Sequence, residues 1–457
     1  MSARLTVLVI HALRPTSRQT TIDHLLAFRE HLPNADVQYL HFAQPLPQEI
    51  AEGVSPDLLI VNYDYLNYRF SPLWPYIKNR HRNIARRSKK VVAIAQDDFW
   101  GHQLLDNWCM SWEVDRILTP IDNDLHVLYP RAIKHIDIRS VLTGYAPTVA
   151  PVVTPLAKRP IDLGQRVRAM PPHLGAYAQE KGNQTSEFAG FARAAGFTVD
   201  VSTKVEDSIV GDAWPQFLQQ CKFTVGMKGG ASIADPYGLL YNRVEARRHR
   251  RGSEHLTTSS FGFLRRRDEK HRFSAISPRL FEAAAAGTCQ VLRPDNYLNA
   301  LEPWVHYLPL NADFSNAGDV LAAMRNLDSC QAMVQTAAER LITSGEFGYH
   351  HLVRAVTDGL LAAGALHEHD SQWKSFSDFL LFASELCASG QIHLHDAAVQ
   401  LIHSGLPTSG NSAHGAAETI HAQVIARGHQ NWFNAMAELS RPDSLSWRSP
   451  WVWRPLR

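Results

Sequence analysis

The chain has few cysteines, and they form no pattern. Its 457 residues include five, at positions 109, 221, 289, 330 and 387, each inside an apolar segment and none in a C-x-x-C pair. This usage excludes a disulfide framework and a cysteine-based zinc site, and it indicates a reducing compartment. Either Cys109 or Cys221 as a nucleophile remains open beside the commoner role, a buried thiol. No histidines have the H-E-x-x-H spacing, so we expect neither a metal nor a cofactor.

Long hydrophobic runs and a charge imbalance are also lacking. No apolar run reaches membrane-spanning length, and the opening MSARLTVLVIHALRP is too short for a signal peptide with a cleavage site. The 46 Lys and Arg residues against 44 Asp and Glu leave a net charge of +2, which implies neither a polyanion binder nor an acidic tail. We therefore expect a cytoplasmic protein, with peripheral contact at the inner face of a membrane left open.

The sequence contains two series of short apolar runs, and each series alternates with helical patterns. With 45% hydrophobic residues, 457 positions are enough for two or three packed domains. Apolar runs between helices are typical of parallel sheets that are covered on both faces. The proline-rich stretch 146–160 separates the two series. Strands are expected at 5–12, 37–42, 57–63, 90–96, 116–120 and 139–145, and then at 161–167, 197–202, 222–227, 289–294 and 304–310.

The predicted fold class is α/β, with two Rossmann-like domains facing each other across a cleft and a mainly helical C-terminal extension. Ligands of open α/β sheets bind at the carboxyl ends of the strands, so facing domains place a site between them. The expected divisions are a first domain at 1–147, a linker at 148–160, a second domain at 161–345, a helix crossing back at 346–365, and an extension of unknown role at 366–457.

The segment SPRLFEAAAAGTCQVL, residues 277–292, carries the most specific pattern. Ser277 is a good helix N-cap, and Pro278 suits the first helical position. The free N–H groups of such a turn, with the helix dipole, form an anion site suited to a diphosphate. One turn further on, the carboxylate of Glu282 can accept hydrogen bonds from both vicinal hydroxyls of a ribose. The alternative for Glu282 is a solvated helix carboxylate.

This segment resembles the C-terminal domain of GT-B glycosyltransferases, most closely the bacterial spore-maturation glycosyltransferase-like group (glycosyl transferases group 1). The stretches at 96–100, 175–188, 301–316 and 347–356 resemble the same group. By organisation the resemblance covers about residues 1–365, and its sharpest motifs lie between 161 and 315. It implies sugar transfer from a nucleotide-diphosphate sugar to a hydroxyl of a surface polysaccharide, lipid-linked glycan or protein side chain, without a catalytic metal.

The resemblance also implies donor-binding residues. Many retaining members have an E-x(7)-E motif that ends at the position of Glu282, but here Ser274 stands at its first position, so the sequence departs from that pattern. In the family a basic pair, after the first strand of the domain and in the next helix, holds the donor diphosphate. Arg166 or Arg168 and Lys181 match these places, and we count Arg279 with them. Cations suit the negative charge that accumulates on the departing nucleotide, although surface charges would give the same pattern.

Two further groups of residues follow predicted strands. In GMKGGASIAD, residues 226–235, Lys228 and Ser232 are candidates to touch the base or phosphates, although a tight turn explains the loop as well. Inverting transfer needs a base for the acceptor hydroxyl. Candidates are Asp97 and Asp98 after the strand at 90–96 and His11 after the first strand, although loop acids also cap helices. The stretch 11–24 is an expected acceptor loop.

The stretch 243–272 holds ten Lys and Arg residues against four acids. A solvated insertion is its ordinary explanation, and an anionic lipid-linked acceptor or membrane surface is the alternative. Nucleic acid is not expected, because no recognition motif accompanies the charge. Two other functions compete with transfer, namely a GT-B-shaped binding or scaffold protein without turnover and a sugar-nucleotide epimerase. The oligomeric state is left open.

Overall fold

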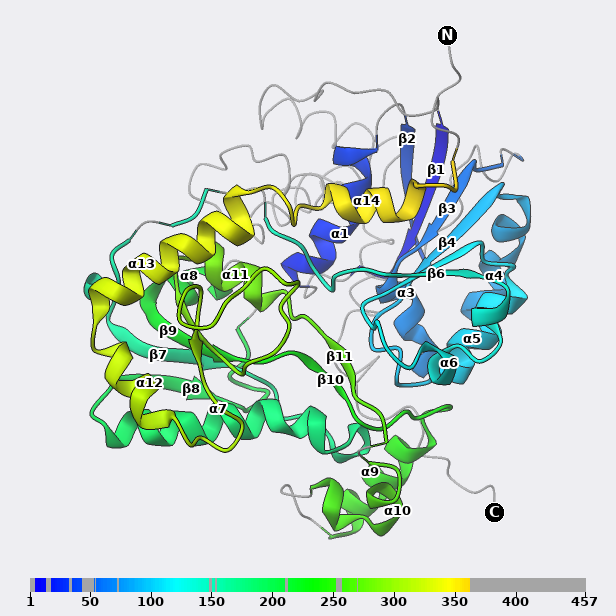
Figure 1. The fold of residues 1–457 in the computed structure, drawn as a ribbon. Helices are drawn as coiled ribbons and strands as arrows, with labels where there is room; N and C mark the ends of the chain where they lie inside the picture. The colour runs from blue at the N-terminus through cyan, green and yellow to red at the C-terminus, as the bar shows by residue number, and fades with distance from the viewer. Residues whose placement is uncertain are drawn as a thin grey trace, which may run out of the picture.

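The structure is a computed structural model in which two α/β lobes lie next to each other (Figure 1). The expected extension at 366–457 lies outside the described residues. The structure describes residues 5–13, 18–32, 35–42, 53, 55–71, 74–147, 150–152, 154–209, 213–251, 257–268 and 270–361.

The first lobe is built on a six-stranded parallel sheet in the order β2-β1-β3-β4-β5-β6. Its central strands are buried on both faces, because alternate side chains of one strand enter different cores. On β1, Leu8 and Ile10 join one cluster whereas Val7 and Val9 join the other. The strands are β1 Leu5–His11, β2 Ala35–His41, β3 Leu58–Val61, β4 Lys90–Ile94, β5 Arg116–Thr119 and β6 Asp137–Ser140. The helices are α1 Gln19–His31, α3 Tyr63–Leu66, α4 Trp74–Arg87, α5 His102–Ser111 and α6 Leu125–Leu128.

The second lobe has a five-stranded parallel sheet in the order β13-β12-β9-β7-β8. Its strands are β7 Ile161–Arg166, β8 Val199–Ser202, β9 Cys221–Gly226, β12 Cys289–Leu292 and β13 Leu308–Pro309. Its helices are α7 Ala176–Ala194, α8 Ala213–Gln220, α11 Arg279–Ala285, α12 Ala317–Met324 and α13 Leu327–Ala338. The prediction of two parallel α/β sheets is confirmed, and this architecture is consistent with the GT-B fold.

An excursion of the second lobe, residues 229–275, reaches the first lobe, and we call it the arm. It begins with β10 Gly229–Ala231 and ends with β11 Phe273–Ala275, which pair antiparallel. Between them lie α9 Leu239–Arg251, a 3₁₀ turn Thr258–Ser260 and α10 Gly262–Arg265. Asp235 bonds the first lobe through its backbone, since its N–H donates to Phe99 O at 2.8 Å and its carbonyl accepts from Gly101 N at 2.7 Å. The arm therefore ties the two lobes together.

The chain crosses back to the first lobe after α13. Helix α14, His350–Thr357, packs on α1, and Leu352, Val353 and Val356 are buried in the first lobe's core. Arg116 of β5 fixes the end of α14, because its Nη1 donates to the carbonyls of Ala355 at 3.1 Å and Val356 at 3.0 Å. Among the residues described, no helix is long and apolar enough to span a bilayer.

Two elements differ from the sequence prediction. Helix α7 begins at Ala176, whereas its local pattern indicated a helix only from about residue 185. Its first turn is completed from the arm, because Asp268 accepts a hydrogen bond from Ala176 N at 3.1 Å. Strand β6 ends at Ser140, so most of the apolar stretch expected as a strand at 139–145 lies beyond the sheet.

Candidate functional site

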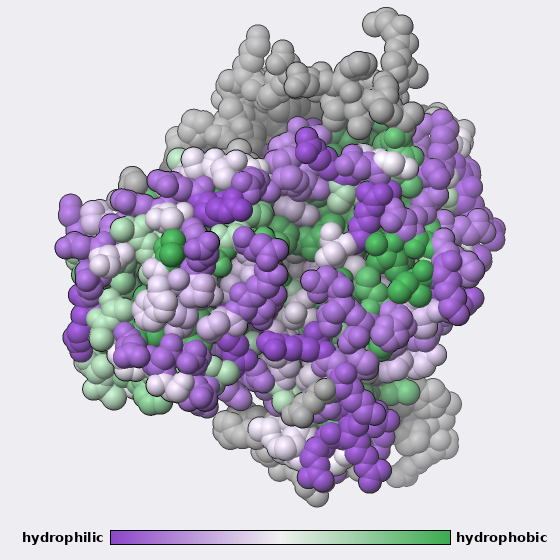
Figure 2. Space-filling model, in the orientation of Figure 1, coloured by the Kyte–Doolittle hydropathy of each residue, from purple (hydrophilic) through white to green (hydrophobic). Residues whose placement is uncertain are grey.

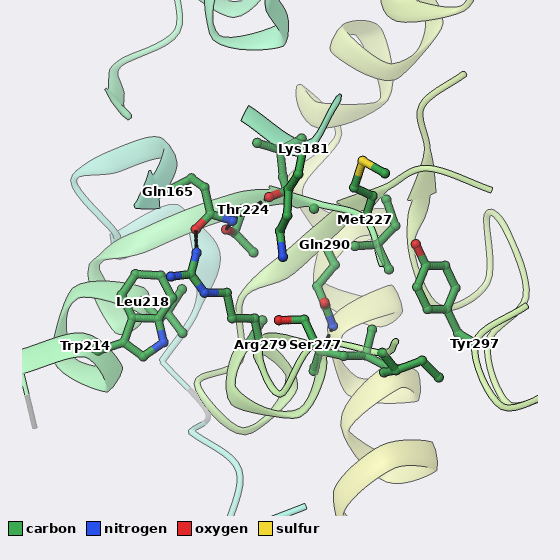
Figure 3. A pocket seen from close by; sticks show the side chains of 16 residues that line it. Gln165, Lys181, Trp214, Leu218, Thr224, Met227, Ser277, Arg279, Gln290 and Tyr297 are labelled. Carbon is green, nitrogen blue, oxygen red and sulfur yellow. Dashed lines mark hydrogen bonds between the residues drawn. The ribbon is translucent and has the colours of Figure 1, made fainter. Parts of the chain in front are cut away.

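A hollow that is partly open to solvent lies at the carboxyl ends of three strands of the second sheet (Figure 3). The parallel register brings these ends together, because Leu292 at the end of β12 lies opposite Gly226 at the end of β9. Polar side chains reach the hollow from several elements, which is typical of ligand sites in open α/β sheets. They include Gln165 from β7, Lys181 from α7, Trp214 from α8, and Ser277 and Arg279 at the start of α11.

Glu282 lies in the first turn of α11, half-buried, beside this hollow. Its Oε2 accepts a hydrogen bond from Trp214 Nε1 at 2.7 Å. Its Oε1 accepts only a long bond, 3.5 Å, from Thr20 Oγ1 of the first lobe. The carboxylate is therefore held between the two lobes, with one oxygen firmly bonded and the other weakly bonded.

Arg279 stands beside Glu282 and is held by the strand end. Its Nη1 donates to Gln165 Oε1 at 2.8 Å and also to the carbonyl of Arg166, and its guanidinium lies 4.6 Å from the centre of the Trp214 ring. Burial lowers the pKa of Arg279 to about 10, with Glu282 opposing the shift and Arg18 adding to it. The guanidinium remains charged at neutral pH.

Lys181 points into the hollow between Arg279 and Gln290 (Figure 3). Within the described part of the chain, its ammonium has no hydrogen-bond or ion-pair partner. Burial, and after it the charges of Arg279 and Arg18, lower the pKa of Lys181 to about 7, against the attraction of Glu282. At neutral pH this site thus holds a lysine that an incoming anion would fully charge.

Arg18 adds a third cation from the first lobe. It is exposed at the N-terminal end of α1, and its charge acts on Lys181 and Arg279 in the second lobe and on Asp97 in the first. Arg18 therefore lies where the two lobes meet. Three cations from two lobes and the carboxylate of Glu282 thus act on one another electrostatically, a composition suited to a polyanionic ligand that also presents hydroxyls.

Two predicted donor residues, Arg166 and Lys228, do not line the hollow. Arg166 pairs with Asp200 at 2.8 Å and lies over the Phe217 ring at 4.5 Å. Lys228 pairs with Asp295 at 3.0 Å.

Ser232 is buried, donates to Asp268 at 2.5 Å and accepts from Tyr177 N at 3.2 Å, so it caps α7. Ser277 does line the hollow, but its hydroxyl makes no capping bond. Pro278, already helical at φ −53°, occupies the N-cap that the sequence assigned to Ser277.

In the first lobe, Asp97 lies in the loop after β4. It adopts a left-handed backbone conformation with φ +53° and is exposed. Its carboxylate accepts no hydrogen bond from any residue that the structure describes. The protein around it impairs hydration and raises its pKa, whereas the charges of Arg69 and Arg18 act in the opposite direction. Asp97 is a carboxylate with lone pairs free for a proton.

Arg69 supports this loop from beneath and is fully buried. All five of its N–H groups are used, three of them on the carbonyls of the loop that carries Asp97. The bonds run from Nε to Trp100 O at 3.1 Å, from Nη1 to Leu66 O at 3.1 Å and Asn67 Oδ1 at 3.0 Å, and from Nη2 to Gln96 O at 3.1 Å and Asp97 O at 2.9 Å.

The other two predicted bases are buried away from the junction. Asp98 is 0% exposed and accepts hydrogen bonds from Tyr129 OH at 2.6 Å and from Thr119 Oγ1. His11 is 1% exposed, and its Nδ1 accepts from Leu13 N at 3.2 Å. Of the three predicted bases, only Asp97 is accessible to a substrate.

Two further predictions concern the cysteines and a metal site. Cys109 and Cys221 are buried, and burial raises the pKa of Cys221 to about 12, so neither is an activated nucleophile. Among the described residues, no group of three or more His, Cys, Asp or Glu side chains could hold a metal ion.

Sequence reasoning missed Arg18, Thr20 and Trp214. Arg18 and Thr20 lie within the stretch 11–24 that was expected to meet the acceptor, but Thr20 bonds Glu282 and the charge of Arg18 acts on Lys181, both in the second lobe. The helical pattern that contains Trp214 was visible, but no signal in it marked the indole as a partner of Glu282.

No family model matches the chain, and a search of curated proteins likewise found no match. Three similar solved structures illustrate the fold. Anabaena HepE in complex with UDP and glucose is 10% identical, with a TM-score of 0.40, over 76% of this chain and 98% of its own. The pneumococcal O-GlcNAc transferase GtfA, with UDP and GlcNAc, is 12% identical with a TM-score of 0.38, over 67% and 58%. AviGT4, a glycosyltransferase involved in avilamycin A biosynthesis, is 12% identical with a TM-score of 0.34, over 77% and 97%. All three TM-scores lie below 0.5, so this similarity alone assigns neither family nor substrate.

Proposed function

We propose that the protein is a GT-B glycosyltransferase that takes a sugar from a nucleotide-diphosphate sugar and transfers it to a hydroxyl acceptor. The observation that carries this proposal is the set of Arg18, Lys181 and Arg279 around Glu282, at the carboxyl ends of the second sheet and facing the first lobe. The expected acceptors are a surface polysaccharide, a lipid-linked glycan or a protein side chain.

The cations would bind the diphosphate of the donor. Arg279 keeps its charge and a fixed orientation, because Gln165 and the Trp214 ring hold its guanidinium. Lys181 has no partner among the described residues, so its ammonium is free for a phosphate oxygen. When the sugar–phosphate bond breaks, negative charge accumulates on the departing nucleoside diphosphate, and preorganised cations stabilise that charge.

Glu282 would bind the ribose. Trp214 Nε1 orients one carboxylate oxygen, whereas the 3.5 Å bond from Thr20 to the other is weak enough for a sugar hydroxyl to replace it. A ribose held here would lie at the boundary between the lobes. The donor would then be enclosed from both sides.

Asp97 would act as the base. As the acceptor oxygen bonds to the anomeric carbon, Asp97 takes the proton of that hydroxyl, and the electron pair of the broken sugar–phosphate bond leaves with the nucleoside diphosphate. The carboxylate is exposed, and the raised pKa strengthens it as a base. Arg18 links the two halves of this site, since its charge acts on Asp97 as well as on Lys181.

A thermal-shift panel of nucleoside mono- and diphosphates and nucleotide sugars tests the donor site. We expect stabilisation by one nucleoside diphosphate and its sugar conjugate, lost in Glu282→Ala and retained in the control Glu187→Ala, which changes an exposed glutamate of α7. Donor turnover that depends on an added acceptor would support transfer. If no nucleoside diphosphate stabilises the protein, the proposal is wrong.

A binding protein without turnover is the second candidate. Ser274, in β11 of the arm, stands where many retaining GT-B enzymes have the first glutamate of their motif. Nucleotide-dependent stabilisation with no turnover of any donor would favour this candidate. Conversion of the donor sugar without an acceptor would instead favour an epimerase.

A further inference from the structure

The arm carries several exposed cations without an ion-pair partner among the described residues. The side chains of Arg243, Arg265, Arg266 and Lys270 are exposed, and none of them forms an ion pair with a residue that the structure describes. Some cations of the second lobe are paired, as in Lys222 with Asp162 at 2.7 Å. A surface that leaves several like charges uncompensated is suited to an anionic partner.

One acid of the arm bonds the second lobe. Asp268 accepts hydrogen bonds from Ala176 N at 3.1 Å and from Ser232 Oγ at 2.5 Å, so it belongs to the N-terminal cap of α7. Its charge is spent on a helix end of the second lobe, where it balances the positive end of the helix dipole.

Three arginines of the arm contact the same short segment, residues 261–263. Arg243 lies 4.4 Å from the centre of the Phe263 ring, and Arg247 lies 5.7 Å from that of Phe261. Arg267 donates from Nη1 to the carbonyl of Phe263 at 2.7 Å. Aromatic faces and a carbonyl hold these guanidiniums close together without neutralising them. Figure 2 shows hydrophilic side chains over the lower part of the molecule, where the arm lies.

Two large apolar side chains stand exposed at the start of α9. Tyr237 is 48% exposed and Leu239 is 59% exposed. A tyrosine and a leucine beside a group of arginines match the membrane interface, where apolar groups enter the headgroup region and cations meet lipid phosphates. A nucleic acid or an acidic protein would use the cations but would leave Leu239 in water.

The arm also holds this surface in a fixed place relative to the hollow. The indole of Trp100, in the first lobe, packs 5.1 Å from the ring of Tyr241 in the arm. The backbone of Asp235, also in the arm, forms hydrogen bonds with the residues on either side of Trp100, Phe99 and Gly101. Met227 precedes β10 and Ser277 follows β11, and both line the hollow. A surface bound by the arm would therefore stay close to the donor site.

We propose that the arm docks the protein on an anionic lipid bilayer, with its arginines on lipid phosphates and with Tyr237 and Leu239 in the headgroup region. The proposal goes beyond the proposed reaction and does not require it. Each cation near an anionic bilayer contributes about fivefold to the partition coefficient, so several together give measurable binding that salt weakens.

Co-sedimentation of the full chain with vesicles tests this proposal. We expect the protein to sediment with vesicles of phosphatidylcholine and phosphatidylglycerol at low salt, and to remain in solution with phosphatidylcholine alone. The partition coefficient of the variant Arg243→Gln/Arg265→Gln/Arg266→Gln should be roughly a hundredfold lower, because three losses of about fivefold multiply. The matched control Lys134→Gln/Lys158→Gln/Arg193→Gln changes three exposed cations outside the arm and should lose much less.

The apolar contribution needs a separate variant. Tyr237→Ser/Leu239→Ser should weaken the binding that persists as salt is raised, because apolar insertion is not screened. Unchanged thermal stability of each variant, with its nucleotide-dependent shift where the parent has one, shows that it is folded. Equal losses in the arm variant and the control would overturn the proposal. So would equal binding to both kinds of vesicle, or binding to a soluble polyanion such as heparin but to neither vesicle.

Discussion

At the carboxyl ends of their strands, the first and second sheets use their polar side chains in opposite ways. At the end of the second sheet, Lys181 feels the charges of Arg279, Arg18 and Glu282 and has no hydrogen-bond or ion-pair partner within the described residues. At the end of the first sheet, Arg69 satisfies all its donors on the protein itself and Asp98 is buried with Tyr129, so Asp97 alone is accessible among the predicted bases. Under the proposed function, this difference assigns anion binding to the second lobe and the proton acceptor to the first.

The largest expected effect is that of Asp97→Asn, which tests the first-lobe half of this comparison. Removing a general base lowers kcat by about 10² to 10⁴-fold. Nucleotide affinity should stay within about twofold, because Asp97 does not line the hollow. Steady-state kinetics and calorimetric titration measure the two quantities. A variant that loses nucleotide affinity as much as rate would show that the lobes do not divide the work in this way.

The pH dependence of the same reaction sharpens the assignment. The pKa of Asp97 is raised above its ordinary value, and only the deprotonated carboxylate accepts the proton. The rate should therefore rise with pH through that raised pKa and then level off, and this acid limb should disappear in Asp97→Asn. The matched variant Asp98→Asn should retain the limb and lose thermal stability instead, because it disturbs a buried hydrogen-bond network.

Arg279→Ala tests the second-lobe half, with a smaller expected effect. A charge-assisted hydrogen bond is worth about 1.5–3 kcal/mol, so the dissociation constant for a nucleoside diphosphate should rise about 10- to 100-fold. The affinity for the corresponding nucleoside should change much less, because it lacks phosphates. Arg193→Ala, an exposed arginine at the far end of α7, is the control. Equal losses for nucleoside and diphosphate would contradict the role of Arg279.

Lys181 gives the diphosphate site its own pH dependence. The pKa of Lys181 is about 7 in the free protein, and a bound anion would raise it. Affinity should be constant at pH values well below 7 and should fall as pH rises beyond 7, by at most tenfold per unit, because binding then requires proton uptake. Titration calorimetry in buffers of different ionisation enthalpy measures that uptake. Lys181→Met should bind more weakly without taking up a proton, and uptake that persists in this variant would exclude Lys181 as its source.

Trp214→Phe should have the smallest effect. It keeps a ring near Arg279 but removes the 2.7 Å bond from Nε1 to Glu282. One hydrogen bond to a carboxylate that water can replace contributes about 1 kcal/mol, so nucleotide affinity should fall about fivefold. An effect as large as that of Arg279→Ala would mean that the indole contacts the nucleotide directly.

The sequence was informative about both sheets because their strands are buried on both faces. All four residues of β3, Leu58–Val61, are 0% exposed, and such a continuous apolar run is visible without any partner. The start of α7 was not visible, because Asp268 and Ser232, which complete its first turn, are far away in the chain.

The candidate site was predictable only in part, for the same reason. Arg166 and Arg279 looked equivalent as donor ligands, yet Asp200 reaches Arg166 only once β8 pairs beside β7. Arg279 instead bonds Gln165 at the rim of the hollow. Arg18 reaches the site only through the packing of the two lobes, which local sequence does not encode.

The way in which Arg69 holds its loop has a consequence for protein engineering. Because the guanidinium grips main-chain oxygens of Gln96, Asp97 and Trp100, the shape of this turn is insensitive to which side chains it displays. Under the proposed reaction, residues beside Asp97 on this turn could then be exchanged to change which alcohol is accepted, whereas Asp97 itself, with its φ of +53°, must stay as the base. Lysine at position 69 has only three donors, so it could not form all five hydrogen bonds that fix this turn.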